Sequence, residues 1–185
     1  MVVQSVARQT FRMAASPETA LDAFLGRLAA LARAHDLLLD SDMREIGLRD
    51  LVEGAIKGSG NTLERFRISG KNSPVPGAYA TPIVLAVHEL CTNSIKYGSL
   101  SGPEGMVELT WGRTSKGDRF AFEWLEVGGP PVLAPSRSGF GSVLLGRMLE
   151  AEIGGNVVID YAPTGLRCCF ETSIPGIEAD REPQG

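Results

Sequence analysis

Polar side chains share one face of a helix that the sequence predicts over residues 82–98. They stand at positions i, i+3, i+4 and i+7, so at 3.6 residues per turn they lie in one line: Glu89, Thr92, Asn93 and Lys96. An acid, an amide and a base arranged in this way can hold a metal ion together with a phosphate group. A solvated helix face has the same pattern, and the helix alone leaves both interpretations open.

The limits of this helix are predicted from its flanking residues. Thr81 followed by Pro82 is a typical helix start, and Gly98 is a typical stop. The face opposite the polar line is predicted to contact the core, and it carries Val84, Val87, Cys91, Ser94 and Ile95. The sequence therefore predicts a helix with one mainly apolar face toward the core and an opposite face of polar residues that could bind a ligand.

Two later segments have residue types that suit a nucleotide. In the first, a strand ends at Glu126 and is followed by Gly128, so a carboxylate can accept a hydrogen bond from an exocyclic amine while glycine lets a flat ring approach. In the second, Gly139-Phe140-Gly141 begins a predicted helix, whose free N–H groups suit phosphate. Taken singly, each segment is also explained by a strand-end charge or a tight turn.

The N-terminal region is predicted to form a helical hairpin. A helix over residues 2–14 is followed by Ser16-Pro17, which caps a second helix. Apolar positions of that second helix are spaced as in a heptad repeat: Leu21, Phe24, Leu28, Leu31, His35 and Leu38. This seam suits pairing with the first helix and with a second copy of the chain. A hairpin that only covers a core is the alternative.

The rest of the chain predicts an α+β fold. We expect the hairpin to occupy residues 1–40, a compact domain residues 41–177, and a flexible tail residues 178–185. Helices are predicted over 48–56 and 142–153, a bend over 74–77, a long Gly- and Pro-rich loop over 128–139, and strands over 65–69, 106–111, 119–127, 156–161 and 166–174. Hairpin-paired strands with interspersed helices predict a mixed, mostly antiparallel sheet covered by helices on one face.

Composition excludes several classes of protein. The 185 residues are 43% hydrophobic and carry a formal net charge of -4, so no basic field points to nucleic acid. No apolar run approaches the ~20 residues that cross a bilayer, and the start lacks the pattern of a signal peptide. Three cysteines without C-x-x-C spacing argue against a disulfide framework and a zinc site. We expect a cytoplasmic protein.

Several separate motifs resemble one known family, the HWE histidine kinases. Residues 88–98, HELCTNSIKYG, resemble the N box of that family, and Trp124-Leu125-Glu126 followed by glycines resembles its G1 box. Residues 137–141, RSGFG, resemble its G2 region, and residues 4–10 and 34–38 resemble its helical hairpin. The resemblance covers roughly residues 2–175 and implies the GHKL (Bergerat) α/β sandwich as the fold of the compact domain.

The resemblance also implies where the phosphates of Mg-ATP would bind. Asn93 is expected to ligate Mg²⁺, Glu89 to polarise the attacking nucleophile, and Lys96 to contact phosphate. Arg137 is expected to contact phosphate as well, and Gly139, Phe140 and Gly141 to form the phosphate cradle.

For the base, the resemblance implies a second set of contacts. Tyr97 is expected beside the adenine, and Glu126 takes the adenine-reading role that an Asp has in most relatives. Gly128 is expected to let the ring approach, and residues 130–138 to form a short lid over the ATP. His88 and Trp124, which mark the family, are expected to have packing roles.

The chain departs from the family at the phosphoacceptor. In the family the acceptor histidine precedes the segment that corresponds to residues 2–5, so we expect this chain to begin too late to contain it. His88 belongs to the N box and His35 to the apolar seam, so neither is expected to be phosphorylated. A truncated piece of a longer sensor kinase and a natural variant are both open, and we expect a sensor domain upstream.

The expected function is therefore the catalytic core of a two-component kinase. It would transfer the γ-phosphate of ATP to a histidine for relay to the receiver domain of a response regulator, and the hairpin could form a homodimer. A non-catalytic adaptor that docks a response regulator beside a degenerate nucleotide domain is the main alternative. A GHKL serine kinase of the anti-sigma type is a third possibility.

Overall fold

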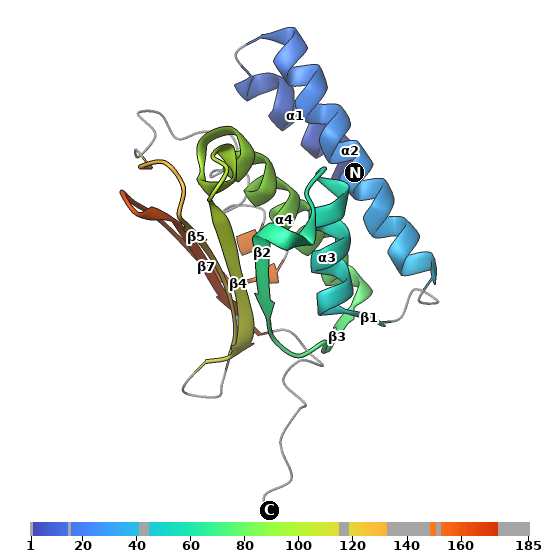
Figure 1. Ribbon diagram of the computed structural model, residues 1–185. Helices are drawn as coiled ribbons and strands as arrows, with labels where there is room; N and C mark the ends of the chain where they lie inside the picture. Colours follow the sequence, from blue (N-terminus) through green and yellow to red (C-terminus); the bar gives the residue numbers. More distant parts are fainter. Residues whose placement is uncertain are drawn as a thin grey trace, which may run out of the picture.

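The computed structural model describes residues 2–14, 16–40, 45–114, 119–132, 149–150 and 153–173. Its helices are α1 (Val2–Met13), α2 (Pro17–Asp40), α3 (Leu48–Gly58) and α4 (Gly77–Tyr97), with the 3-10 turns η1 (Leu63–Arg65) and η2 (Ser99–Ser101). Its strands are β1 (Glu45–Gly47), β2 (Phe66–Ser69), β3 (Pro74–Pro76), β4 (Met106–Arg113), β5 (Phe120–Val127), β6 (Asn156–Ala162) and β7 (Gly165–Thr172). Figure 1 shows the sheet on one side and the helices stacked beside it.

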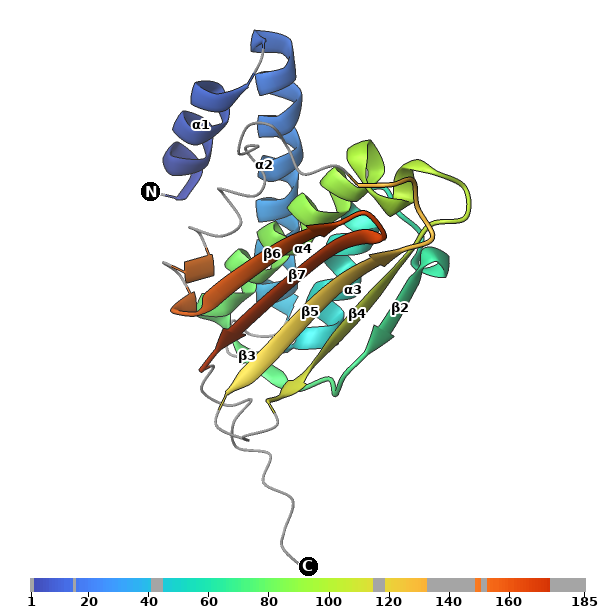
Figure 2. The same cartoon turned by 90° about the vertical axis from the view of Figure 1, so that its left-hand side faces the viewer.

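The main sheet has five strands in the order β2-β4-β5-β7-β6. β2 runs parallel to β4, and the other three pairings are antiparallel. Seen face-on in Figure 2, α3, α4 and the lower part of α2 lie behind the strands, whereas α1 lies beyond the edge of the sheet. The predicted α+β fold, with a mixed and mostly antiparallel sheet covered by helices on one face, is confirmed.

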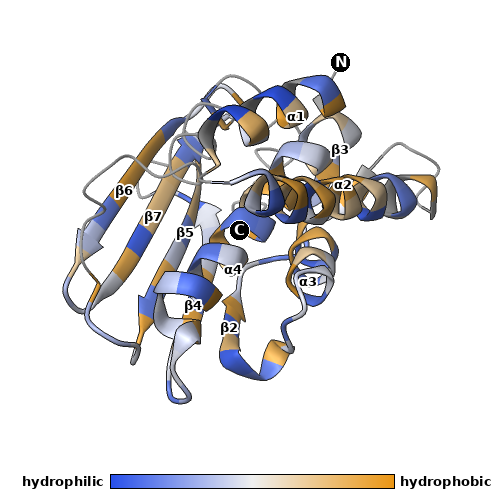
Figure 3. Ribbon diagram, turned by 90° about the horizontal axis from the view of Figure 1, so that it is seen from above, coloured by the Kyte–Doolittle hydropathy of each residue, from blue (hydrophilic) through white to orange (hydrophobic). Residues whose placement is uncertain are grey.

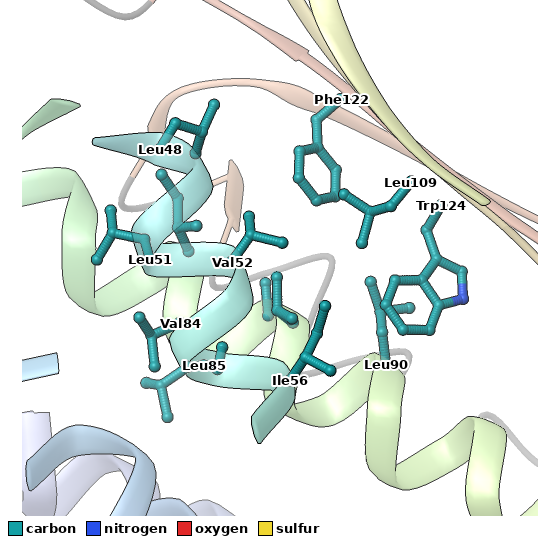
Figure 4. Packing of buried hydrophobic residues seen from close by; sticks show 14 of the residues in the cluster. Leu48, Leu51, Val52, Ile56, Val84, Leu85, Leu90, Leu109, Phe122 and Trp124 are labelled. Carbon is teal, nitrogen blue, oxygen red and sulfur yellow. The ribbon is translucent and has the colours of Figure 1, made fainter. Parts of the chain in front are cut away.

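Alternation along the strands explains why one face is covered. In β5 every second residue is buried, beginning at Phe120 and ending at Glu126, because successive side chains of a strand point to opposite faces. Figure 3, coloured by hydropathy, shows both hydrophobic and hydrophilic stretches along β6 and β7. The buried face meets α3 and α4, and Figure 4 shows Leu109, Phe122 and Trp124 pointing from the sheet toward these helices.

The helical hairpin packs against the same core. The hydroxyl of Ser16 accepts the backbone N–H of Thr19 at 3.2 Å, which caps α2 as predicted. α2 lies against α3 and α4, and its small residues Ala30 and Ala34 are fully buried within the main hydrophobic cluster.

The predicted heptad seam of α2 is not the face that α2 buries in this chain. Leu21 is 49% exposed, Leu28 is 38% exposed and His35 is also exposed, whereas Phe24 and Leu31 are partly buried. The buried side consists instead of Ala20, Arg27, Ala30 and Ala34. Small side chains let α2 approach α4 closely, which the larger leucines would prevent.

Two local predictions were wrong. Residues 74–76 form β3, which pairs antiparallel with β1, where a bend was predicted. α4 begins at Gly77 and includes Pro82, where a start at residue 82 was predicted. Pro82 leaves the carbonyl of Ala78 without its helical donor, and because Ala78 is exposed, water can replace that donor. The predicted end is confirmed, since Gly98 follows the last helical residue.

Several predictions lie outside the described residues: the tail from 178, the helix at 142–153 except residues 149–150 and 153, and the loop at 128–139 beyond residue 132. None of the helices in the described ranges combines the length and the apolar character that a bilayer crossing requires.

Candidate functional site

The predicted polar line runs along α4 from a buried region to an exposed one. Glu89 is only 3% exposed, Asn93 is half-buried, and Lys96 and Tyr97 are exposed, Tyr97 by 73%. Ile95, predicted for the core face, is 41% exposed, because Ser94 is the residue of that turn that faces the core and Ile95 lies ~100° further round the helix. The polar line therefore becomes open to solvent toward the C-terminal end of α4.

Glu89 is held by an arginine of the hairpin. Its Oε1 lies 2.7 Å from Nε of Arg27, and its Oε2 accepts a hydrogen bond of 2.7 Å from the second terminal nitrogen of the same guanidinium. Arg27 is 5% exposed, so the two charges form a buried, bidentate pair. In this arrangement the carboxylate faces α2.

His88 also lies at the interface between α4 and α2. It is 8% exposed, and a Cβ at Gly26 would lie 3.4 Å from its Nε2. Burial, together with the nearby charges of Arg33, Arg27 and Lys96, lowers the pKa of His88 to about 4. The Nδ1 atom has no hydrogen-bond partner among the described residues. His88 is thus a neutral packing residue, as predicted.

The exposed part of the polar line has few internal contacts. The hydroxyl of Thr92 donates to the carbonyl of His88 at 2.8 Å, so it is engaged within its own helix. No hydrogen bond joins the side chain of Asn93 or Lys96 to another side chain or backbone group within the described ranges. The amide and the ammonium are therefore open to a ligand.

Glu126 is a buried carboxylate beside the end of α4. It is 1% exposed; its Oε2 accepts the backbone N–H of Ser99 at 2.7 Å, and its Oε1 accepts the indole N–H of Trp124 at 3.3 Å. Burial raises the pKa of Glu126, and the bonds from Ser99 and Trp124 oppose that rise. The spacing of two residues puts Trp124 and Glu126 on the same face of β5, which explains how the indole reaches the carboxylate.

Glycines bring α4, η2 and the end of β5 together. A Cβ at Gly98 would lie 2.0 Å from Oε2 of Glu126, and a Cβ at Gly129 would lie 2.3 Å from Cα of Ser99. Gly128 has a φ of 69°, which favours glycine. These positions admit no side chain, so the carboxylate, the helix end and the glycine turn form one compact corner.

An arginine outside the predicted motifs fixes this corner. The guanidinium of Arg65 donates to the carbonyls of Ser99, Leu100, Gly102 and Gly105, at distances between 2.5 and 3.4 Å. It thereby holds the segment that follows α4 against the start of β2. Arg65 has no sequence signal, because its carbonyl partners are up to 40 residues away.

The structure thus brings Glu126 against Gly98, at the end of α4 where Lys96 and Tyr97 are exposed, and directs Glu89 toward α2. The predicted positions Arg137, Gly139, Phe140 and Gly141 lie outside the described residues. The contact of Arg27 with Glu89 was not predicted from the sequence. The one signal for it was a charged residue on the face of α2 that otherwise carries small side chains.

Comparisons with known proteins agree with the motifs and the fold. The family model described as "HWE histidine kinase" matches residues 1–72. The chain is 39% identical over 168 residues to a blue-light-activated histidine kinase of Brucella anthropi, a match that covers 89% of this chain and 34% of that protein. The chain spans about a third of the length of this curated relative.

Solved structures share the fold at low sequence identity. The blue-light activated histidine kinase of Erythrobacter litoralis EL346 matches with a TM-score of 0.65 and 16% identity, over 96% of this chain and 59% of that one. The histidine kinase ThkA, in a complex with the response regulator protein TrrA, matches with a TM-score of 0.53 and 18% identity, over 97% of this chain and 59% of that one. By its motifs, its sequence relatives and its GHKL-type fold, this chain belongs to the HWE histidine kinase family.

Proposed function

We propose that this chain is the ATP-binding catalytic core of a two-component histidine kinase, which transfers the γ-phosphate of ATP to a histidine for relay to a response regulator. One observation carries the proposal: a buried carboxylate, Glu126, lies against Gly98 at the C-terminal end of α4, the helix that carries half-buried Asn93 and exposed Lys96. This is where a base and its phosphates would have to lie.

The residues at this corner fit an adenine. Each oxygen of Glu126 already accepts one N–H, and a carboxylate oxygen has a second lone pair to offer an exocyclic amine. The two N–H donors fix the carboxylate in position before any ligand arrives. Gly128 adds no side chain beside it, and exposed Tyr97 supplies a ring on the helix side. The proposal assigns these residues to the base.

The open end of α4 fits Mg²⁺ and phosphate. Mg²⁺ prefers oxygen ligands and is usually held by one or two protein groups together with substrate phosphates. Asn93 supplies an amide oxygen and Lys96 a positive charge. In the proposal, Arg137 and Gly139-Phe140-Gly141 complete the phosphate contacts. Bound Mg²⁺ would neutralise charge as the phosphoryl group moves, which is the main requirement of this chemistry.

Glu89 is proposed to polarise the attacking histidine nitrogen. It lies one helical turn before Asn93, close enough along α4 to serve the same phosphoryl group. In the structure its carboxylate is paired with Arg27, so this role requires that the pair opens.

Partners follow from the family and from the fold. A structural neighbour of this chain is a histidine kinase in complex with a response regulator, and we propose a receiver domain as the partner of this chain. The exposed leucines of α2 favour a homodimer through the hairpin. The adaptor alternative requires a degenerate nucleotide site, against which the fixed carboxylate of Glu126 and the open amide of Asn93 argue.

Titration with a fluorescent ATP analogue, with and without Mg²⁺, tests the proposal. We expect Mg-dependent binding that Asn93→Ala weakens by about tenfold or more, because a metal ligand is lost. Asn156→Ala, an exposed amide at the start of β6, is the control and should bind like the unsubstituted chain. Absence of Mg-dependent binding, or binding that Asn93→Ala leaves unchanged, would support the adaptor instead.

A further inference from the structure

The polar line of α4 is closed at one end by α2. Asn93 and Lys96 are open, but Glu89, one turn earlier, is 3% exposed and gives both carboxylate oxygens to Arg27. A carboxylate in this state cannot contact an attacking nucleophile. The structure therefore shows Glu89 withdrawn from the site to which its neighbours belong.

Arg27 is connected to α1 as well as to α4. Its remaining terminal nitrogen donates to the hydroxyl of Thr10 at 3.3 Å, and that hydroxyl donates to the carbonyl of Val6 at 2.6 Å. Thr10 is 2% exposed, so the chain of bonds from α1 through Arg27 to Glu89 is buried throughout. A movement of α1 would therefore act on the guanidinium that holds Glu89.

Small side chains of α2 line its contact with α4 beside this pair. Gly26 faces His88, and Ala30 follows one turn later, while Leu21, Leu25 and Leu28 of α2 are 49%, 51% and 38% exposed. Separation of α2 from Glu89 would thus expose less apolar surface than separation of helices that meet through leucines, and burial of such surface is what normally holds helices together.

The free-energy cost of opening the Arg27–Glu89 pair is also limited. In a buried ion pair the Coulomb attraction is largely offset by the cost of removing two charges from water. Opening the pair returns both groups to water, so its net cost is modest. Removal of one partner alone is different, because the other charge is then buried without compensation. Arg27 can therefore hold or release the Glu89 carboxylate at a low cost in free energy.

We propose that Arg27 is a positioning residue that withdraws Glu89 from the phosphoryl-transfer site and couples its release to the position of α1. This inference rests on the proposed function, because it assigns regulation to the same site. It predicts that loss of the Arg27 guanidinium makes the Glu89 carboxylate accessible while the rest of the core stays closed.

Carboxyl footprinting of the full chain tests this directly. Carboxylates are coupled to an amine with a water-soluble carbodiimide, without nucleotide, and each position is quantified by mass spectrometry. Glu104, which is exposed, is the reference, and Glu126, which is 1% exposed, reports any loosening of the core. In Arg27→Gln we expect labelling of Glu89 to rise at least about fivefold relative to Glu104, with Glu126 still protected.

Matched variants separate positioning from general stability. Arg33→Gln removes the same charge from the same helix and should leave Glu89 protected. Within the described residues no ion pair or hydrogen bond joins Arg33 to that carboxylate, and Arg33 acts on His88 through its charge. Arg27→Lys should restore most of the protection. If Arg27→Gln does not fold, Thr10→Val, which removes only the bond toward α1, should raise Glu89 labelling by a smaller factor.

The outcomes are distinguishable from a failure of the proposed function. Unchanged Glu89 labelling in both Arg27→Gln and Thr10→Val, or parallel labelling of Glu126, would overturn the inference. Nucleotide titration of the same variants tests the proposed function by itself, and Mg-ATP affinity should stay within about twofold of the unsubstituted chain. A chain that binds no Mg-ATP would refute the proposed function, whatever the footprint shows.

Discussion

His88 and Glu89, two adjacent buried residues of α4, contact α2 in different ways. His88 is neutral, because its imidazole is desolvated and faces the cationic side chains of Arg27, Arg33 and Lys96, which lower its pKa to about 4. Glu89, next to it, has its countercharge in Arg27. These adjacent residues thus contact α2 differently: His88 packs as a neutral ring against Gly26, and Glu89 forms an ion pair with Arg27.

The lowered pKa of His88 makes the stability of the fold depend on pH. An unfolded histidine protonates near pH 6.5 and the folded one only near pH 4, so stability is lost as the pH falls through this window. The loss amounts to about 3 kcal/mol at most, from the size of the shift. His88→Leu should remove most of this acid sensitivity, as measured by urea unfolding at pH 7, 6, 5 and 4.

His35 provides the matched control for this prediction. It is exposed on α2, so His35→Leu should leave the pH dependence of unfolding as it is in the unsubstituted chain. If His88→Leu loses as much stability at acidic pH as the unsubstituted chain does, carboxylates elsewhere in the chain cause that loss.

At the scale of elements, the corner between α4, η2 and β5 depends on close backbone approach. Gly98 lets the helix end directly over the carboxylate of Glu126, and that carboxylate in turn caps the N–H of Ser99 at the start of η2. Arg65 fixes the segment that follows. The end of one helix, a 3-10 turn and a strand are thus joined through one side chain.

A methyl group at position 98 tests this close approach. Gly98→Ala places a Cβ 2.0 Å from Oε2 of Glu126, so the carboxylate must move and release Ser99, at a cost of about 1–3 kcal/mol in the free energy of unfolding. Gly112→Ala is the control, because Gly112 is an exposed position of β4 where an added Cβ would meet nothing within 4 Å. It should change stability by less than about 1 kcal/mol. Thermal unfolding of both variants checks the difference, and equal effects would contradict the packing explanation.

At the scale of the whole molecule, the hairpin has two different sides. One side, made of small residues and Arg27, contacts α3 and α4. The other keeps large apolar residues exposed on both helices: Val3, Phe11, Leu21, Leu25, Leu28 and Leu39. Exposed apolar residues arranged along two adjacent helices are typical of an interaction surface, and in the proposed function a second copy of the chain covers it.

Dimerisation through this surface gives a direct prediction. Leu25→Glu combined with Leu28→Glu places charges in the middle of the surface, where burial would be costly, so light scattering should show a shift from dimer toward monomer. Val158→Glu changes an exposed apolar residue of β6 and should leave the assembly unchanged. If the unsubstituted chain is monomeric at all accessible concentrations, a second copy of the chain does not cover this surface.

Local patterns predicted most elements, because helix caps, alternation and turn residues act within a few positions. The end of α4 at Gly98, the cap at Ser16, and β4, β5, β6 and β7 are where these signals predicted them to within a few residues. The prediction was wrong where tertiary packing prevailed. Pro82 was accepted inside a helix with a buried core face, and residues 74–76 became a strand because β1 lay beside them.

The sequence by itself determined the family motifs, the order of the elements and the face of α4 that carries its polar residues, because each depends on residue types at short spacings. Only the tertiary structure decided what those residues touch. Glu89 meets Arg27 from 62 positions earlier in the chain, and Glu126 meets the N–H of Ser99 from 27 positions away. Such contacts depend on how helices and strands pack across the core, and residue spacing along the chain has no information about that packing.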